Sequence, residues 1–584
     1  MTSTHFDVII VGAGPFGIIA AKTYLELNPI ASLALLETDT SLGGAWSKSR
    51  IYPGMYSQSP LGMIEFSDVP MKPTPQHYKN CVPAHHVHEY LASYVATHIY
   101  DGKSIRDRIH LDTRVVSVQK WYGPPDGAGN RSGRGGSAWV VGTDRGQTII
   151  CSKIMIAGGI TSRPYIPFFN APDFTPPILH TEDSARLAPT LMEPGCVRNV
   201  IVIGGSKSAI DAVHMFISAG KQVDWIISDK GSDHPGMCVA GRAPVYFKRS
   251  HRILSTRLMS KLSPCIFQPP DGWMRFFHQT RVGRWTTNTV WSTMQSAWLK
   301  AARYGRSGDM SSLRPQLPMF WRSDDIGVSN PHNFWRTMSQ ANVHRSSIDR
   351  VENSSVVLAN TTTLPCDLLI MSTSWEVTFP FFAPADASTL GLPQILEAAA
   401  DRTILSMFPK LARPPNFDRH PVNTTQFYIY RGIVSPRESR EGDNSIVFLG
   451  QVGAAQSFHI AETQSIWAAA YLMGKLRLPS VEEMEMDIAL TNAWRRRRYL
   501  SVGERKLTFM HDELAYVSML LRDLGINHKR KYGRLKELFQ PYSNKDYRGM
   551  LEEWRMIQKE REQDGETETV YEESRTSSPG IAAL

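Results

Sequence analysis

A glycine-rich turn between a strand and a helix constrains this chain most. The apolar residues 6–11 predict a buried parallel strand, and Gly12-Ala13-Gly14-Pro15-Phe16-Gly17 follows it directly, ahead of an Ala/Ile-rich helix that runs to about Asn28. In such a turn the first glycine permits the tight bend, the second lets the backbone approach a pyrophosphate, and the third allows close helix–strand packing. We therefore predict a dinucleotide site at Gly12, Gly14, Pro15, Phe16 and Gly17.

A carboxylate supports this prediction. Residues 32–37 read as the next strand, and Glu37 ends it, 20 residues after Gly17. At that spacing a carboxylate can accept hydrogen bonds from the ribose hydroxyls of the dinucleotide. Glu37 therefore joins the predicted site.

A second, degenerate glycine turn follows the apolar strand at residues 198–203. Serine and alanine stand where two of its glycines would be, so the candidate cofactor residues are Gly204, Ser206, Lys207, Ser208, Ala209 and Asp211. The next strand, at 223–228, ends at Asp229-Lys230. A carboxylate there favours NAD and a cation favours the 2′-phosphate of NADP, and we favour NADPH through Lys230, with a merely solvated lysine as the alternative.

Composition excludes several other classes. Of the six cysteines, the closest two (Cys238 and Cys265) are 27 residues apart, which disfavours a redox dithiol, a zinc ribbon and a disulfide framework. No apolar run reaches the roughly 18 residues of a membrane span, and the N-terminus lacks a basic signal region. The net charge of +9 over 584 residues suits an anionic cofactor without indicating nucleic acid. A cytoplasmic protein with no transmembrane segment is expected.

Further motifs carry a family resemblance. They occur in this order: Gly43-Gly44-Ala45-Trp46, Glu65–Pro70, Phe174 with His180, Asp367–Trp375, Glu462–Trp467 and Leu478-Pro479-Ser480. As a set they resemble the flavin-containing monooxygenases, class B flavoprotein monooxygenases, over about residues 5–230 and 365–480. The long middle segment and the C-terminal pattern look like the longer fungal members associated with secondary metabolism.

The resemblance implies an enzyme with FAD and NADPH as cofactors. NADPH would reduce the flavin, and O₂ would add at C4a to give a hydroperoxyflavin that delivers one oxygen atom to a small organic substrate. Hydroxylation, epoxidation and heteroatom oxidation stay open. Ala45, Trp46, Ser57, Gln58 and Ser59 would line the FAD site, with Gln58 in the position of the family's catalytic Asn. A turn-capping role is the alternative for Gln58.

The sequence also departs from the family pattern. Pro176 and Ser184 replace a glycine and an aromatic residue of the identifying stretch that contains His180. A Baeyer–Villiger monooxygenase acting on a ketone is an alternative that Ser184 disfavours. A non-oxygenating NADPH flavin reductase is a second alternative, and a non-catalytic nucleotide-binding protein is disfavoured by the intact first turn.

The implied fold is α/β, with two Rossmann-like dinucleotide-binding domains, a helical insertion and a helical C-terminal extension. We assign FAD binding to 1–165 and 365–480, NADPH binding to 195–365 with an insertion at 231–345, a helical extension to 481–560 and a disordered tail to 561–584. The insertion is expected to bury most of its six tryptophans and to line a substrate tunnel with one or two of them: Trp273, Trp285, Trp291, Trp298, Trp321 and Trp335.

Three polar clusters have competing interpretations. His85, His86 and His88 are interpreted as a helix start rather than a zinc site. Arg495–Arg498 is interpreted as a solvated helix face, with contact to phosphate or an anionic membrane surface as the alternative. His180 either orients the two domains or the cofactor, or pairs with backbone in the core.

Overall fold

The structure is a computed structural model. It describes residues 4–75, 81–121, 138–169, 171–228, 250–302, 304, 308–315, 317–321, 334–391, 394–395, 398–415, 424–425, 427–440, 442–454, 456–500 and 507–563. Lys230 and most of the predicted tail lie outside these residues.

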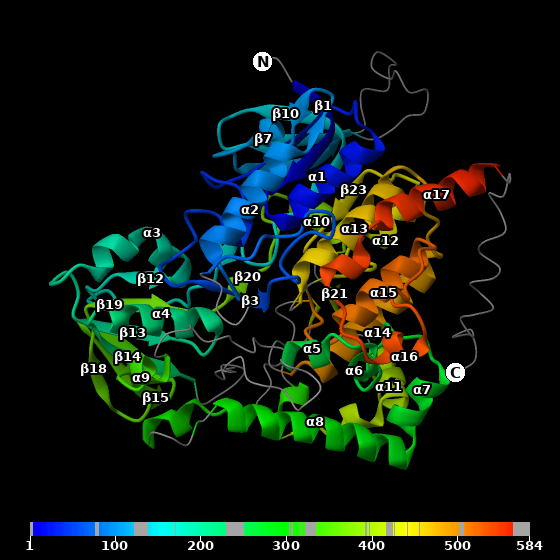
Figure 1. Ribbon diagram of the computed structural model, residues 1–584. Coiled ribbons are helices and arrows are strands. Elements are labelled where there is room, and N and C mark those ends of the chain that lie inside the picture. Colours follow the sequence, from blue (N-terminus) through cyan, green and yellow to red (C-terminus); the bar gives the residue numbers. More distant parts are fainter. Residues whose placement is uncertain are drawn as a thin grey trace.

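The first sheet has seven strands and contains β1, the strand that leads into the first glycine turn (Figure 1). Its order is β7-β2-β1-β10-β9-β8, with β23 also paired to β10. The β1, β2, β7, β10 and β23 pairings are parallel, whereas β8, β9 and β10 form an antiparallel meander. The strands are β1 (Thr4–Val11), β2 (Leu33–Leu36), β7 (Ile109–His110), β8 (Val115–Trp121), β9 (Ala138–Thr143), β10 (Thr148–Ile156) and β23 (Ile446–Phe448).

The second sheet is parallel throughout and has the order β12-β19-β13-β14-β15. Its strands are β12 (Ile178–His180), β13 (Asn199–Ile203), β14 (Gln222–Ile227), β15 (Asn342–Arg345) and β19 (Leu368–Met371). Helices α3 (Thr181–Met192) and α4 (Lys207–Ser218) accompany it. The α/β fold with two dinucleotide-type sheets is therefore confirmed. Strands β12 and β19 extend the second sheet beyond the predicted range 195–365, and the domain boundaries stay a prediction.

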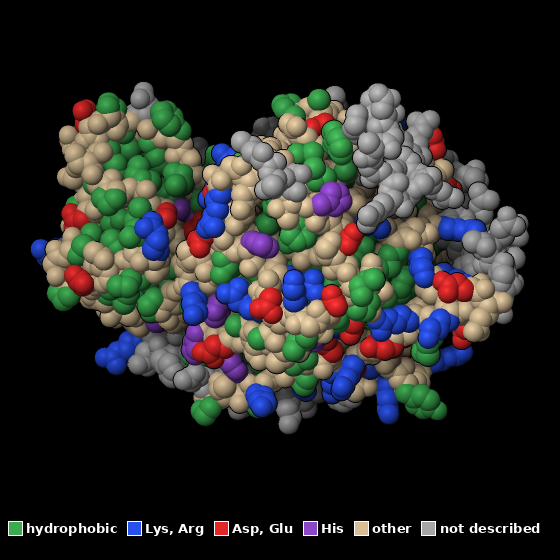
Figure 2. Space-filling view, turned by 90° about the horizontal axis from the view of Figure 1, so that it is seen from above, with side chains coloured by type: hydrophobic (Ala, Val, Ile, Leu, Met, Phe, Trp, Pro, Cys, Tyr) green, Lys and Arg blue, Asp and Glu red, His purple; other side chains and the backbone are tan. Residues whose placement is uncertain are grey.

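This second sheet forms a lobe of its own, at the left of Figure 1. Seen from above in Figure 2, hydrophobic side chains gather over that lobe, while cationic and anionic side chains intermingle over the rest of the face. Beside it, β16 (Ile348–Glu352), β17 (Ser355–Leu358) and β18 (Thr363–Pro365) make a small antiparallel sheet.

Helix α13 (Ser457–Leu472) is buried at every position after Ser457. It packs against α1 (Pro15–Leu27) on one side and α15 (Glu513–Asp523) on another. The C-terminal extension thus covers the face that would otherwise meet solvent. That extension consists of α14 (Val481–Arg498), β25 (Leu507–Thr508), α15, α16 (Arg534–Phe539), η7 (Asn544–Tyr547) and α17 (Met550–Gln563).

The remaining elements connect these layers. The short strands are β3 (Tyr56–Pro60), β4 (Cys81–Pro83), β5 (Ile99–Tyr100), β6 (Lys103–Ser104), β11 (Arg163–Pro164), β20 (Trp375–Glu376), β21 (Gln394–Ile395), β22 (Thr424–Thr425) and β24 (Val452–Gly453). The helices are α2 (Ala84–Thr97), α10 (Pro384–Thr389), α11 (Ala398–Met407) and α12 (Pro436–Arg440). Within the described ranges, no helix is long and apolar enough to cross a membrane.

The insertion is helical, but its tryptophans are only partly buried. Its described helical elements are α5 (Ser250–Leu254), α6 (Arg257–Lys261), α7 (Gly272–Met274), η3 (Arg275–Gln279), α8 (Arg281–Ala302), η4 (Gly308–Leu313), η5 (Met319–Trp321) and α9 (Phe334–Met338). Trp291 and Trp321 are buried and Trp298 is half-buried, whereas Trp273 and Trp285 are exposed. The expectation of general burial was therefore wrong for those two, because α7 and the first turn of α8 lie at the outer edge of the molecule (Figure 1).

The arginine run also differs from its interpretation as a solvated face. Arg495 and Arg498 are buried at the end of α14. Arg496 and Arg497 both bind the Asp401 carboxylate, at 3.4 Å and 2.7 Å. The run therefore joins α14 to neighbouring segments and offers no free cationic surface.

We expect Gly283→Ala to destabilise the protein strongly. A β-carbon on Gly283 would stand 1.8 Å from the Phe276 carbonyl oxygen, so the backbone of α8 or η3 would have to move. A free-energy loss of about 3 kcal/mol or more would match such overpacking. Gly272→Ala is the control, since nothing described lies within 4 Å of its added carbon. Equal unfolding midpoints in a denaturant titration would contradict this packing.

Candidate functional site

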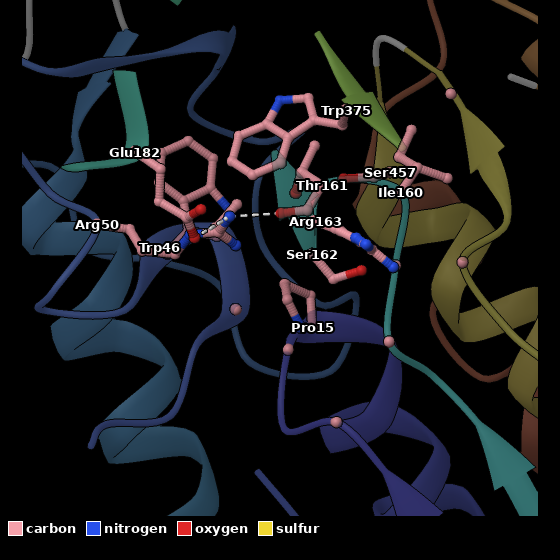
Figure 3. A pocket seen from close by; sticks show the side chains of 18 of the residues that line it. Pro15, Trp46, Arg50, Ile160, Thr161, Ser162, Arg163, Glu182, Trp375 and Ser457 are labelled. Atoms are coloured by element: carbon pink, nitrogen blue, oxygen red, sulfur yellow. Dashed lines mark hydrogen bonds and ion pairs between the residues drawn. The ribbon is translucent and has the colours of Figure 1, made fainter. Parts of the chain in front are cut away.

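One cavity of about 1260 Å³ lies where both glycine turns meet. It opens at the carboxyl ends of β1 and β13, the usual ligand position in parallel α/β sheets. Its lining comes from both sheets, from β3 and from the C-terminal extension. Figure 3 shows part of it, with Pro15 below and the side chains of Arg50, Glu182 and Trp375 above.

The first glycine turn is built as the sequence predicts. Gly12 has φ of +105°, and a β-carbon there would stand 2.7 Å from the Ala157 carbonyl oxygen. Gly14 caps α1, and Pro15 occupies its first turn. Gly12, Gly14, Pro15 and Phe16 line the cavity, whereas Gly17 packs behind them, where a β-carbon would stand 2.0 Å from the Gly12 carbonyl oxygen.

Glu37 lies at the cavity edge and braces the turn from the side. Its Oε2 accepts the Ala13 amide at 2.7 Å and its Oε1 accepts the Asp39 amide at 3.0 Å. Burial raises the pKa of this carboxyl, while the two amide donors favour its charged form. The carboxylate therefore fixes the geometry of the turn and still borders the space where a ribose would lie.

The Gly43–Trp46 segment faces the first turn. A β-carbon on Gly44 would stand 3.1 Å from the Gly14 Cα, so both glycines permit this close approach. Ala45 and Trp46 line the cavity. The Trp46 carbonyl lies 3.1 Å from Nδ1 of His88, which gives that histidine a packing role.

Among the described residues no group of three His, Cys, Asp or Glu side chains is placed to hold a metal ion.

Strand β3 presents Gln58 and Ser59 to the cavity, but not Ser57. Ser57 is fully buried, accepts the Val82 amide at 2.8 Å and donates to the Ser59 carbonyl at 2.6 Å. Ser57 therefore joins β3 to β4 and is not among the lining residues, and its binding of cofactor stays a prediction.

The second turn contributes fewer of its predicted residues. Gly204 has φ of +119°, and a β-carbon there would stand 2.4 Å from the Ser372 carbonyl oxygen, so it shapes the turn from outside the cavity. Ala209 is buried in α4 and also lies off the cavity. Ser206, Lys207 and Ser208 do line it, together with Gly205.

Lys207 is already engaged by a carboxylate. Its Nζ binds Oδ2 of Asp211 one turn along α4, and the hydroxyl of Tyr52 donates to the same oxygen. Since Tyr52 follows the Gly43–Trp46 segment, Asp211 ties the second turn to the first domain. Asp211 is therefore a link between the two parts and does not itself line the cavity.

A second link crosses the cavity through Arg50. Its guanidinium lies 2.7 Å from Oε1 of Glu182, binds the Thr161 carbonyl, and stacks 4.8 Å from the Trp375 ring centroid (Figure 3). The sequence motif contained Trp375, but no local pattern pointed to Arg50 or Glu182, which are far apart in the chain.

His180 pairs with backbone through both ring nitrogens. Nδ1 accepts the Glu182 amide at 3.2 Å, so Nε2 carries the proton and donates to the Ser374 carbonyl at 3.1 Å. Burial lowers the pKa of this imidazole. Of the two interpretations, backbone pairing is confirmed, and this neutral histidine caps α3 beside the Arg50 link.

The C-terminal extension supplies a wall that the sequence did not reveal. Strand β25 pairs in parallel with β24, and the Phe509 amide donates to the Gly453 carbonyl at 2.9 Å. This pairing places Thr508 and Met510 in the cavity.

The described tryptophans that line the cavity are Trp46 and Trp375, so no described tryptophan of the insertion forms the expected tunnel there.

Comparison with known proteins decides the family. Residues 9–240 match the model of the pyridine nucleotide-disulphide oxidoreductases. The FAD-dependent monooxygenase DEP4 of Alternaria brassicicola is 32% identical, covering 95% of each chain. The FAD-dependent monooxygenase resA of Aspergillus sclerotiorum is 33% identical, covering 96% of this chain and 100% of its own.

The chain belongs to the FAD-dependent monooxygenases. This confirms the family expected from its motifs. The fold of this monooxygenase also matches a cyclohexanone-bound structure of cyclohexanone monooxygenase, with a TM-score of 0.56 at 14% identity, covering 90% of this chain and 99% of the other. At that identity the likeness concerns the fold alone.

The cavity of this monooxygenase fits the FAD of its family. The closely spaced glycines leave a cradle that β-carbons would fill, and the amino end of α1 presents the backbone amides of Gly14 and Phe16 to an anion. Gly12, Gly14 and Phe16 would hold the pyrophosphate, and Glu37 would meet the ribose. Trp46 and Gln58 would lie beside the ring system.

Proposed function

We propose that this monooxygenase uses NADPH and FAD to transfer one atom of O₂ to a small organic substrate in fungal secondary metabolism. The observation that carries the proposal is that both glycine turns line one cavity, so two dinucleotides bound there would have their reactive rings in the same space. Hydroxylation, epoxidation and heteroatom oxidation are the reaction types considered.

The bound FAD supplies the redox centre that accepts a hydride and activates O₂, and this chain's residues orient and shield it. Gly205–Ser208, at the amino end of α4, would hold the NADPH pyrophosphate. The side-chain amide of Gln58 would donate a hydrogen bond to the cofactors without adding a charge. Trp46, Trp375 and Met510 would exclude water from the reacting atoms.

Product analysis with isotopically labelled O₂ tests the proposal. The flavin-loaded enzyme is incubated with NADPH and candidate substrates, and the products are weighed by mass spectrometry. One labelled oxygen atom in a hydroxylated, epoxidised or heteroatom-oxidised product supports it. An ester or lactone from a ketone would assign a Baeyer–Villiger enzyme, and NADPH consumption without any labelled product would assign a reductase.

Two lysine variants test how NADPH is recognised. Lys207 begins α4, where we propose that the pyrophosphate shared by NADPH and NADH binds, so Lys207→Ala should raise both KM values by a similar factor. Lys230→Ala should raise the KM for NADPH by about tenfold and leave that for NADH nearly unchanged, since only NADPH has a 2′-phosphate. Steady-state kinetics with both cofactors, with Lys103→Ala as a surface control, decide between the roles. If Lys207→Ala instead raised only the KM for NADPH, Lys207 would be the residue that recognises the 2′-phosphate.

Gln58→Leu tests the amide in the cavity. The variant keeps the size of the side chain but removes its donor, so we expect NADPH consumption to continue while hydrogen peroxide replaces product, with coupling falling by about tenfold or more. Gln58→Asn, which restores an amide, should recover part of the coupling. An unchanged ratio of product to NADPH in Gln58→Leu would leave Gln58 as a lining residue of β3 without a role in coupling.

A further inference from the structure

An exposed aromatic surface lies on the insertion, where α7, η3 and the first turn of α8 meet. Four large apolar side chains share it: Trp273, Phe276, Val282 and Trp285, with exposed fractions of 51%, 41%, 63% and 67%. Scattered apolar residues are ordinary on protein surfaces, but two half-exposed tryptophans within thirteen residues of chain are not. We call these four residues the α7–α8 surface.

The surface is rigidly mounted. Trp273 stacks on the buried Phe277, with ring centroids 5.6 Å apart and an interplanar angle of 18°. Gly283 lets the first turn of α8 pack directly on the backbone of Phe276 and Phe277. The exposed rings are therefore held outward by packing beneath them, so little conformational entropy would be lost when another surface covers them.

The charged side chains of this segment are all of one sign. Residues 272–308 contain no Asp or Glu but six Lys or Arg. Three of the arginines flank the rings: Arg275, Arg281 and Arg284. Among the described residues none of these three forms an ion pair with a carboxylate, and Arg284 donates only to the Gln279 carbonyl, at 2.7 Å. Asp271, the nearest acid in sequence, is engaged by Lys261 and by the Met274 amide.

We propose that the α7–α8 surface docks this enzyme on an anionic lipid membrane. Tryptophan and phenylalanine side chains favour the headgroup region, and arginines beside them attract acidic lipids. The absence of carboxylates among the described residues of this segment removes the repulsion that an anionic surface would otherwise meet. The arginine run at 495–498, the sequence-based candidate for membrane contact, cannot serve because it is buried or paired.

Vesicle flotation with the full-length, flavin-loaded enzyme tests this docking. We expect binding to phosphatidylcholine vesicles that contain about 30% phosphatidylserine, little binding to pure phosphatidylcholine, and release at about tenfold higher salt. The double variant Trp273→Ser/Trp285→Ser should weaken binding by about tenfold or more because it removes the inserted rings. Arg281→Glu/Arg284→Glu should weaken it at least tenfold, since about fivefold is lost per cationic residue.

Matched controls come from elsewhere on the surface. Ile30→Ser removes an apolar residue that is even more exposed, at 81%, and Arg145→Glu reverses a charge in the turn between β9 and β10. Both should bind as the parent does, with flavin absorbance and melting temperature unchanged in all variants. Failure of the parent to bind acidic vesicles at low salt, or equal loss in Ile30→Ser and the tryptophan pair, overturns the proposal. A dimer in solution that the tryptophan pair abolishes, without vesicle binding, would assign the surface to a second copy.

Discussion

Gly17→Ala should yield a chain that neither folds normally nor retains flavin. The added β-carbon would stand 2.0 Å from the Gly12 carbonyl oxygen and 3.4 Å from Cγ2 of Ile10, at the point where α1 packs on β1. Neither backbone can give way without opening the first glycine turn, so we expect a loss of several kcal/mol, above about 4. Circular dichroism melting and visible flavin absorbance measure it.

Gly14→Ala separates folding from cofactor binding. Its added β-carbon would lie 3.6 Å from the Gly44 Cα, an ordinary contact, so the variant should fold. Gly14 lines the cavity at the amino end of α1, so we expect the variant to lose flavin while keeping its secondary structure. If Gly17→Ala retained stoichiometric flavin, the assignment of this turn to FAD would be wrong.

Arg498→Met should destabilise the protein by about 3–5 kcal/mol, the range for breaking a buried ion pair. Arg498 and Asp512 are both fully buried, with Nε and Oδ2 4.0 Å apart. The arginine also donates to the Phe320 carbonyl and to the Ser263 hydroxyl, so it joins the insertion to the C-terminal extension. Removing it leaves the Asp512 carboxylate with the Tyr499 hydroxyl but without its cation.

The neighbouring arginine provides the control. Arg497 pairs with Asp401 near the surface, so Arg497→Met should cost about 1 kcal/mol or less. Urea titration of both variants gives the comparison. Asp512 lies two residues after Met510, which lines the cavity, so Arg498→Met should also lower the affinity for flavin. Equal unfolding midpoints for Arg498→Met and Arg497→Met would refute a structural role for the buried pair.

The parts of the site that could be predicted are those whose chemistry is local in sequence. A glycine turn followed by a carboxylate at fixed spacing identified Gly12, Gly14 and Glu37, because one βαβ unit holds all three. The degenerate turn located Ser206–Ser208 for the same reason. Ser57 lies off the cavity although its neighbours Gln58 and Ser59 line it, because the sequence does not show which side chains of β3 reach that space.

The rest depends on contacts between distant segments. Arg50 meets Glu182 only when the two sheets come together, and Met510 reaches the cavity only because β25 adds to β24. The exposure of Trp273 and Trp285 was equally hidden. Aromatic composition predicts burial on average, whereas their position at the outer edge of the insertion is a property of the tertiary structure.

The pairing of β25 with β24 has a consequence for how the enzyme is made. The first glycine turn is synthesised almost five hundred residues before Thr508 and Met510, which form one wall of the cavity. A nascent chain therefore holds an open half-site through most of translation. We expect tight flavin capture to wait for this pairing, so that premature termination before β25 yields chains without flavin.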